Sequence, residues 1–102
     1  MTQIERIAYM ESILQEAADI FGQFSPMLER YEAIQSQITA LKAYYGSQEW
    51  RDDFASDAAG LLPPDLRRGV LSEDEVYDLL LLNRGLLAHM REIVRQYGGD
   101  ES

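Results

Sequence analysis

Apolar residues recur every three or four positions along most of this chain, and this spacing constrains the fold more than any other feature. It is the spacing of one face of an α-helix, and no stretch alternates apolar and polar residues for long enough to indicate a strand. The pattern predicts four helices, at residues 3–23, 26–45, 48–59 and 73–97. We therefore expect an all-α fold: an antiparallel bundle of three long helices, with one short helix and an ordered Pro/Gly connector.

The expected helix boundaries rest on capping and stop signals. Two pairs of residues have the spacing of a capping box, Thr2 with Glu5 and Ser72 with Glu75. Ser25 followed by Pro26 predicts that one helix ends and the next begins there, because proline is favoured at the first helical position. The connector, residues 61–71, contains two prolines and a glycine and is expected to hold one helical turn at most.

The length of 102 residues suits one domain. We expect a single helical domain at residues 1–99 and a disordered tail at residues 100–102. The first ten residues already place charges among the apolar positions, so no secretion signal is visible. A cytoplasmic location is therefore expected.

The charge of the chain argues against several classes of partner. Eighteen acidic residues against nine basic ones give a net charge of −9, which disfavours binding to nucleic acid and to anionic membrane surfaces. No apolar run is long enough to span a membrane. The chain has no cysteine, which excludes disulfides and thiolate metal sites. An unidentified protein is the expected partner, and homo-oligomers are possible.

Candidate catalytic and metal-binding residues are few. His89 is the only histidine, and we expect it to be an ordinary solvent-facing side chain. Glu49, Asp52, Asp53 and Asp57 place four carboxylates on one helical face. Carboxylates on one straight helix rarely surround an ion, so a solvated acidic face is the expectation. We predict no catalytic residue, no metal, no cofactor and no enzymatic activity.

Two further groups of side chains attract attention. Tyr44, Tyr45 and Trp50 flank a Gly-Ser turn, where aromatic residues form either the end of a helical core or a binding pocket. Arg67 and Arg68 are the only basic doublet. We expect the arginines to hold the connector in place by pairing with nearby acids; the alternative is an exposed contact with an anion or a partner. The acids expected to pair with them are Asp52, Asp53 and Glu73.

The segment from Tyr44 to Leu80 resembles a bacterial family known only as domain of unknown function 4298. The resemblance rests on two motifs, YYGS-x-x-W-x-x-D and LP-x-DL-[KR]-RGVLSED, and extends back to the opening IERIAYMESIL. In this sequence the motifs correspond to Tyr44–Ser47, Trp50, Asp53, Leu62, Pro63 and Asp65–Asp74. The resemblance implies a bacterial origin and a helical fold, and it supplies no activity, cofactor or catalytic residue.

These observations favour a small helical module that works by protein–protein interaction. The residues expected to form its partner or ligand surface lie in the two motifs: Tyr44, Tyr45, Trp50, Asp53, Arg67, Arg68, Glu73 and Asp74. One alternative is a ligand-binding domain or enzyme with a pocket near Tyr44, Trp50, Asp53 and Arg67. Another is a structural homodimer joined through Tyr77, Leu81 and Leu82.

Overall fold

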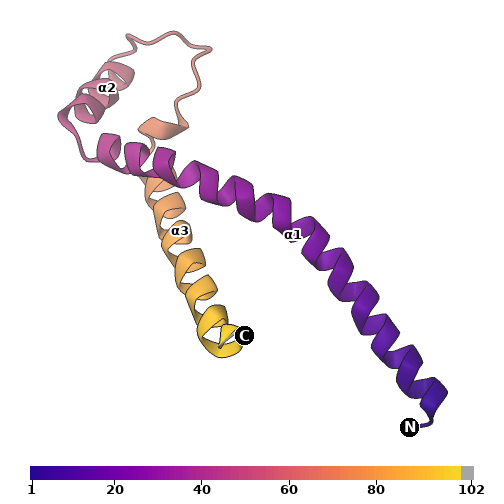
Figure 1. The fold of residues 1–102 in the computed structure, drawn as a ribbon. Coiled ribbons are helices and arrows are strands. Elements are labelled where there is room, and N and C mark those ends of the chain that lie inside the picture. The colour runs from indigo at the N-terminus through magenta and orange to yellow at the C-terminus, as the bar shows by residue number, and fades with distance from the viewer. Residues whose placement is uncertain (100–102) are drawn as a thin grey trace. The chain divides into compact units, whose positions relative to one another are not determined.

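The computed structural model describes residues 1–99, and all its regular elements are helical. In chain order they are α1 (Gln3–Tyr45), α2 (Gln48–Ala58), the 3-10 turn η1 (Gly69–Leu71), α3 (Glu73–Ile93) and the π-helical turn η2 (Val94–Gly98) (Figure 1). The all-α prediction is confirmed for this part of the chain, which holds three α-helices and no strand. A packed antiparallel bundle is not shown and stays a prediction. The expected tail at residues 100–102 lies outside the described residues.

The first helix is continuous, so the predicted break between residues 23 and 26 is wrong. Pro26 lies inside α1 and has no N–H to donate to the carbonyl of Gly22, four residues earlier. The helix continues because the apolar spacing runs through this point without a change of phase, from Phe24 to Leu28. Pro26 stands two residues from each of these and so faces the opposite, polar side, where water can bond the carbonyl.

The structure divides into two compact units, Met1–Ser36 and Gln37–Ser102, whose boundary falls within α1. The expectation of a single domain stays a prediction.

In the first unit, the capping box at the start of α1 is confirmed in both directions. The backbone N–H of Thr2 donates to Glu5 Oε1 at 2.9 Å, and the N–H of Glu5 donates to Thr2 Oγ1 at 3.1 Å.

In the second unit, α2 starts and stops where the sequence predicts. Ser47 Oγ accepts from the backbone N–H of Trp50 at 3.1 Å and so caps the N-terminus. Gly60 adopts a left-handed conformation at φ 73°, which favours glycine. The N–H groups of Gly60 and Leu61 then donate to the carbonyls of Asp57 and Ser56, which closes the helix with a Schellman motif.

The connector ends in η1, which contacts both α2 and α3. Three side chains are buried, one from each of these elements: Trp50 of α2, Leu71 of η1 and Val76 of α3. The core of the second unit is therefore a small cluster in which the connector contributes the central apolar residue.

The last helix begins at its predicted cap. Ser72 Oγ accepts from the N–H of Glu75 at 3.4 Å, and three acidic side chains occupy the first turn, where the helix dipole favours them. The predicted range of 73–97 is covered by α3 together with η2. None of the helices formed by the described residues is both long and apolar enough to cross a membrane.

Candidate functional site

Trp50 joins α2 to the connector. Its indole N–H donates to the carbonyl of Val70 at 2.9 Å. Its ring meets Tyr45 edge-on at a centroid distance of 5.4 Å and stacks on Phe54 at 5.2 Å. With 9% of its surface exposed, Trp50 belongs to the core and offers little area to a partner.

Tyr45 joins the end of α1 to the start of α3. Its hydroxyl donates to the backbone carbonyl of Glu73 at 2.9 Å. The side chains of Glu73 and Asp74 are exposed on the first turn of α3. Tyr45 and Glu73 are therefore brought together, but through a main-chain atom that leaves the Glu73 carboxylate out of the bond.

Arg68 holds the connector in its folded path. Its guanidinium donates to Asp57 Oδ1 at 2.5 Å, to the carbonyl of Pro63 at 2.7 Å and to that of Leu66 at 3.3 Å. The ion pair is half-buried, with 32% of the Arg68 side chain and 27% of the Asp57 side chain exposed. The prediction that this doublet pairs with an acid is confirmed for Arg68, but the acid is Asp57 of the last turn of α2. The expected partners Asp52, Asp53 and Glu73 are not used by Arg68.

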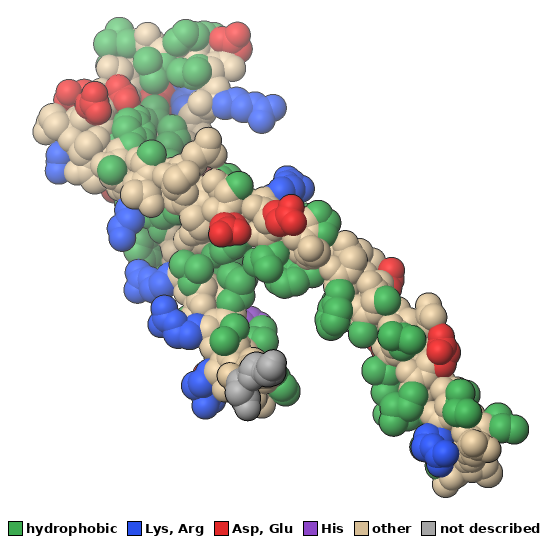
Figure 2. All heavy atoms as spheres, viewed as in Figure 1, with side chains coloured by type: hydrophobic (Ala, Val, Ile, Leu, Met, Phe, Trp, Pro, Cys, Tyr) green, Lys and Arg blue, Asp and Glu red, His purple; other side chains and the backbone are tan. Residues whose placement is uncertain are grey.

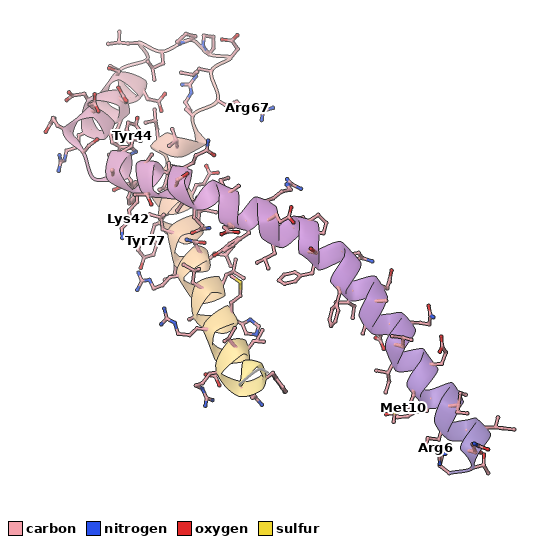
Figure 3. The ribbon with its side chains drawn as sticks, viewed as in Figure 1. Arg6, Met10, Lys42, Tyr44, Arg67 and Tyr77 are labelled. Carbon is pink, nitrogen blue, oxygen red and sulfur yellow. The ribbon has the colours of Figure 1, made fainter. Side chains whose placement is uncertain are left out.

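Arg67 has different surroundings from its neighbour. Its side chain is exposed and makes no hydrogen bond or ion pair with any residue from 1 to 99. It extends away from the connector (Figure 3). The predicted pairing of Arg67 with a nearby acid is therefore wrong, and its guanidinium is available to a partner.

A hydrogen bond between Tyr44 and Asp53 links the end of α1 to α2. The Tyr44 hydroxyl donates to Asp53 Oδ2 at 2.6 Å. This hydrogen bond raises the pKa of Tyr44 to about 12, with smaller contributions from desolvation and from the negative charges of Asp53 and Glu49. Tyr44 is therefore a neutral hydrogen-bond donor at neutral pH.

A hollow of about 340 Å³ lies between the connector, α2 and the end of α1. It is lined by four polar and four apolar residues: Tyr44, Asp53, Arg67, Arg68, Leu62, Leu66, Val70 and Leu71. Of the predicted site residues, the structure thus gathers Tyr44, Asp53, Arg67 and Arg68 around one space. Trp50 does not line it, and Tyr45, Glu73 and Asp74 lie outside it.

The sequence predicts an ordered connector with a basic doublet, but the apolar side chains of the lining were not among the predicted site residues. The available signal was the repeated leucine and valine in the connector, at Leu62, Leu66, Val70 and Leu71. Apolar side chains gather over this end of the second unit in Figure 2. Their frequency in a segment with so little helix indicates that the connector is packed rather than loose.

The acidic face of α2 is largely engaged by other side chains. Asp53 accepts from Tyr44, Asp57 from Arg68, and Asp52 from the amide of Gln48 at 2.8 Å. Within residues 1–99, no three acidic or imidazole side chains come together in a way that could hold a metal ion.

The model of a family described as Domain of unknown function (DUF4298) matches residues 7–93. The chain belongs to this family. The resemblance seen in the sequence motifs is thereby confirmed over well more than half of the chain. No curated protein and no solved structure was found to match it. The DUF4298 match includes all of α2, the connector and α3, and therefore every residue of the hollow.

Proposed function

We propose that this DUF4298 protein is an interaction module whose hollow binds a short segment of a partner protein. The segment would place an apolar side chain in the hollow and a carboxylate against Arg67. The observation that carries the proposal is a guanidinium with no bond to the described residues, beside a hollow whose lining includes four apolar side chains. Arg is well suited to this role because its planar group can bind a carboxylate through two parallel hydrogen bonds.

The state of the other polar groups supports the same assignment. Each nitrogen of the Arg68 guanidinium donates one hydrogen bond, to Asp57 or to a backbone carbonyl, and Asp53 accepts from Tyr44. Arg67 is therefore the one charged group of the lining without a partner among the described residues. The connector's conformation thus depends on Arg68, whereas Arg67, the preceding residue in the sequence, would contact the partner.

Binding fits the hollow better than catalysis does. A tyrosine whose pKa is raised to about 12 serves neither as a general base nor as a nucleophile near neutral pH. We therefore infer a non-enzymatic role, together with the cytoplasmic location expected from the sequence.

A small anionic ligand is a second candidate for the hollow. The volume of about 340 Å³ lies at the lower end of the range of small-molecule sites, roughly 300–1,000 Å³. Such a ligand would use the same guanidinium, so the two candidates share Arg67 and differ in the size of the bound molecule.

A peptide-display selection on the immobilised protein tests the proposal. Peptides are selected on the wild type and depleted on the Arg67→Ala variant. We expect enrichment of sequences that combine an apolar with an acidic residue, and at least tenfold weaker binding of the resulting synthetic peptide to Arg67→Ala. Arg51→Ala is the matched control, because Arg51 lies on α2 outside the hollow and makes only long hydrogen bonds, of 3.4 and 3.5 Å.

The outcomes separate the two candidates. Equal peptide binding by Arg67→Ala and Arg51→Ala would contradict the proposal. If no peptide is enriched but small carboxylic acids shift the NMR signals of Leu62 and Leu66, the second candidate replaces the first.

A further inference from the structure

The part of α1 in the first unit carries an apolar stripe with a regular heptad repeat. From Ile7 to Tyr31 every a and d position is apolar, eight in succession: Ile7, Met10, Leu14, Ala17, Phe21, Phe24, Leu28 and Tyr31. Apolar a and d positions over at least three to four heptads, with charges at flanking e and g positions, indicate a coiled coil. The repeat stops after Tyr31, because the next two a positions hold Gln35, one residue before the end of the first unit, and Lys42, in the second unit.

This stripe is exposed along most of its length. Ile7, Leu14 and Phe21 are 59%, 60% and 69% exposed. Apolar side chains follow the N-terminal part of α1 in Figure 2. Within the repeat, the positions farthest from the stripe hold two polar residues and the proline: Ser12, Asp19 and Pro26. Pro26 therefore stands where its ring cannot disturb a helix packed against the stripe.

A hollow on the first turns of α1 has the form that a second helix of the same repeat would fill. It measures about 350 Å³ and lies beside Arg6. Its other lining residues are Ile7, Met10, Glu11 and Leu14, at positions i, i+3, i+4 and i+7. Four residues at this spacing form the hole that receives one side chain of the facing helix in a coiled coil.

The flanking positions indicate the identity and direction of that helix. In a parallel, in-register pair, each g position lies beside the e position five residues further on in the partner helix. Arg6 would then meet Glu11 of a second copy, and Ile13 and Ile20 would cover its small Ala18 and Ser25. An antiparallel pair places g beside g and e beside e, which leaves Arg6 without Glu11.

We infer that the protein associates with a second copy of itself through a parallel, in-register coiled coil formed by residues 7–31 of α1. The seam is about 37 Å long. In this arrangement Met10 of each helix enters the hole formed by Ile7, Met10, Glu11 and Leu14 of the other. Both residues labelled at this end of α1 in Figure 3, Arg6 and Met10, then belong to the contact.

Sedimentation equilibrium of the full chain tests the association. We expect the mass of two copies for the wild type over a range of concentrations. Phe24→Glu should weaken the dimer at least tenfold, whereas Gln23→Glu, which adds the same charge one residue away on the polar side, should change it by less than threefold. A monomer at every concentration, or equal behaviour of the two variants, would overturn the inference. Circular dichroism of both variants establishes that each is folded.

Cysteine cross-linking tests the direction of the helices, because the natural chain has no cysteine. Met10→Cys should form a disulfide-linked dimer on mild oxidation, since facing d positions come within disulfide distance in a parallel pair. Gln23→Cys should not. A dimer in which Met10→Cys fails to cross-link would overturn the parallel register.

Discussion

Arg67 and Arg68 are neighbours in the sequence but differ in the bonds that they make. Both precede the glycine that begins η1, and both line the same hollow. Arg68 bonds Asp57 and two backbone carbonyls, while Arg67 bonds nothing among the described residues. The sequence predicts that a basic doublet beside an acidic helix pairs with it. It does not predict which arginine does so, because that depends on the path of the connector.

The ionisation of Tyr44 provides a first prediction. Because the neutral hydroxyl bonds Asp53, its pKa is raised to about 12. The stabilisation from this bond is present below the ordinary tyrosine pKa of about 10 and is lost as the pH rises toward 12. NMR titration of labelled tyrosine rings should show Tyr44 ionising last of the six tyrosines in the wild type, and about as early as a free tyrosine in Asp53→Asn. Identical titration of Tyr44 in both proteins would contradict the hydrogen bond.

The Trp50 indole provides a second prediction. Trp50→Phe keeps an aromatic ring but leaves the carbonyl of Val70 without its donor. We expect the free energy of unfolding to fall by about 1–3 kcal/mol. Urea denaturation followed by circular dichroism measures this change. A loss smaller than about 0.5 kcal/mol would mean that the bond from Trp50 does not hold the connector.

At the scale of the elements, capping residues predict the helix ends correctly, whereas the proline does not. Ser47, Gly60 and Ser72 mark helix ends as predicted, because each bonds or adopts the conformation that the end requires. Pro26 fails as a stop signal, because apolar periodicity over the whole of α1 outweighs one missing hydrogen bond on its polar side. Apolar periodicity that keeps its phase across a proline therefore indicates a continuous helix.

Replacing Pro26 tests the continuity of α1. Pro26→Ala restores an N–H that can donate to the carbonyl of Gly22, which should stabilise a continuous helix by up to about 3 kcal/mol. The helical content measured by circular dichroism should not fall in Pro26→Ala. The NMR chemical shifts of residues 22–27 should be those of a helix in both proteins. If residues 22–25 are non-helical in the wild type, and Pro26→Ala lowers the melting temperature, α1 is interrupted there after all.

At the scale of the whole molecule, the sequence predicts the helical class, the short helix and the turn within the connector. One alternative from the sequence is a pocket near Tyr44, Trp50, Asp53 and Arg67, and all of these except Trp50 line the hollow. The sequence does not predict the apolar part of the lining, because residues from Tyr44 to Leu71 meet only through the folded connector. It also could not show which motif residues are structural. Trp50 and Arg68 bond the connector and Tyr45 bonds the first residue of α3, so the shared motifs of the family describe a packed unit as much as a surface.

The central claim is that Arg68, and not Arg67, holds the connector in its folded path, and urea denaturation of the two alanine variants tests it most directly. Arg68→Ala should lower the free energy of unfolding by about 1–2 kcal/mol, since it removes the half-buried pair with Asp57 and the bonds to two carbonyls. Arg67→Ala should leave it within about 0.5 kcal/mol of the wild type. Equal losses in the two variants, or a larger loss in Arg67→Ala, would contradict this division of roles.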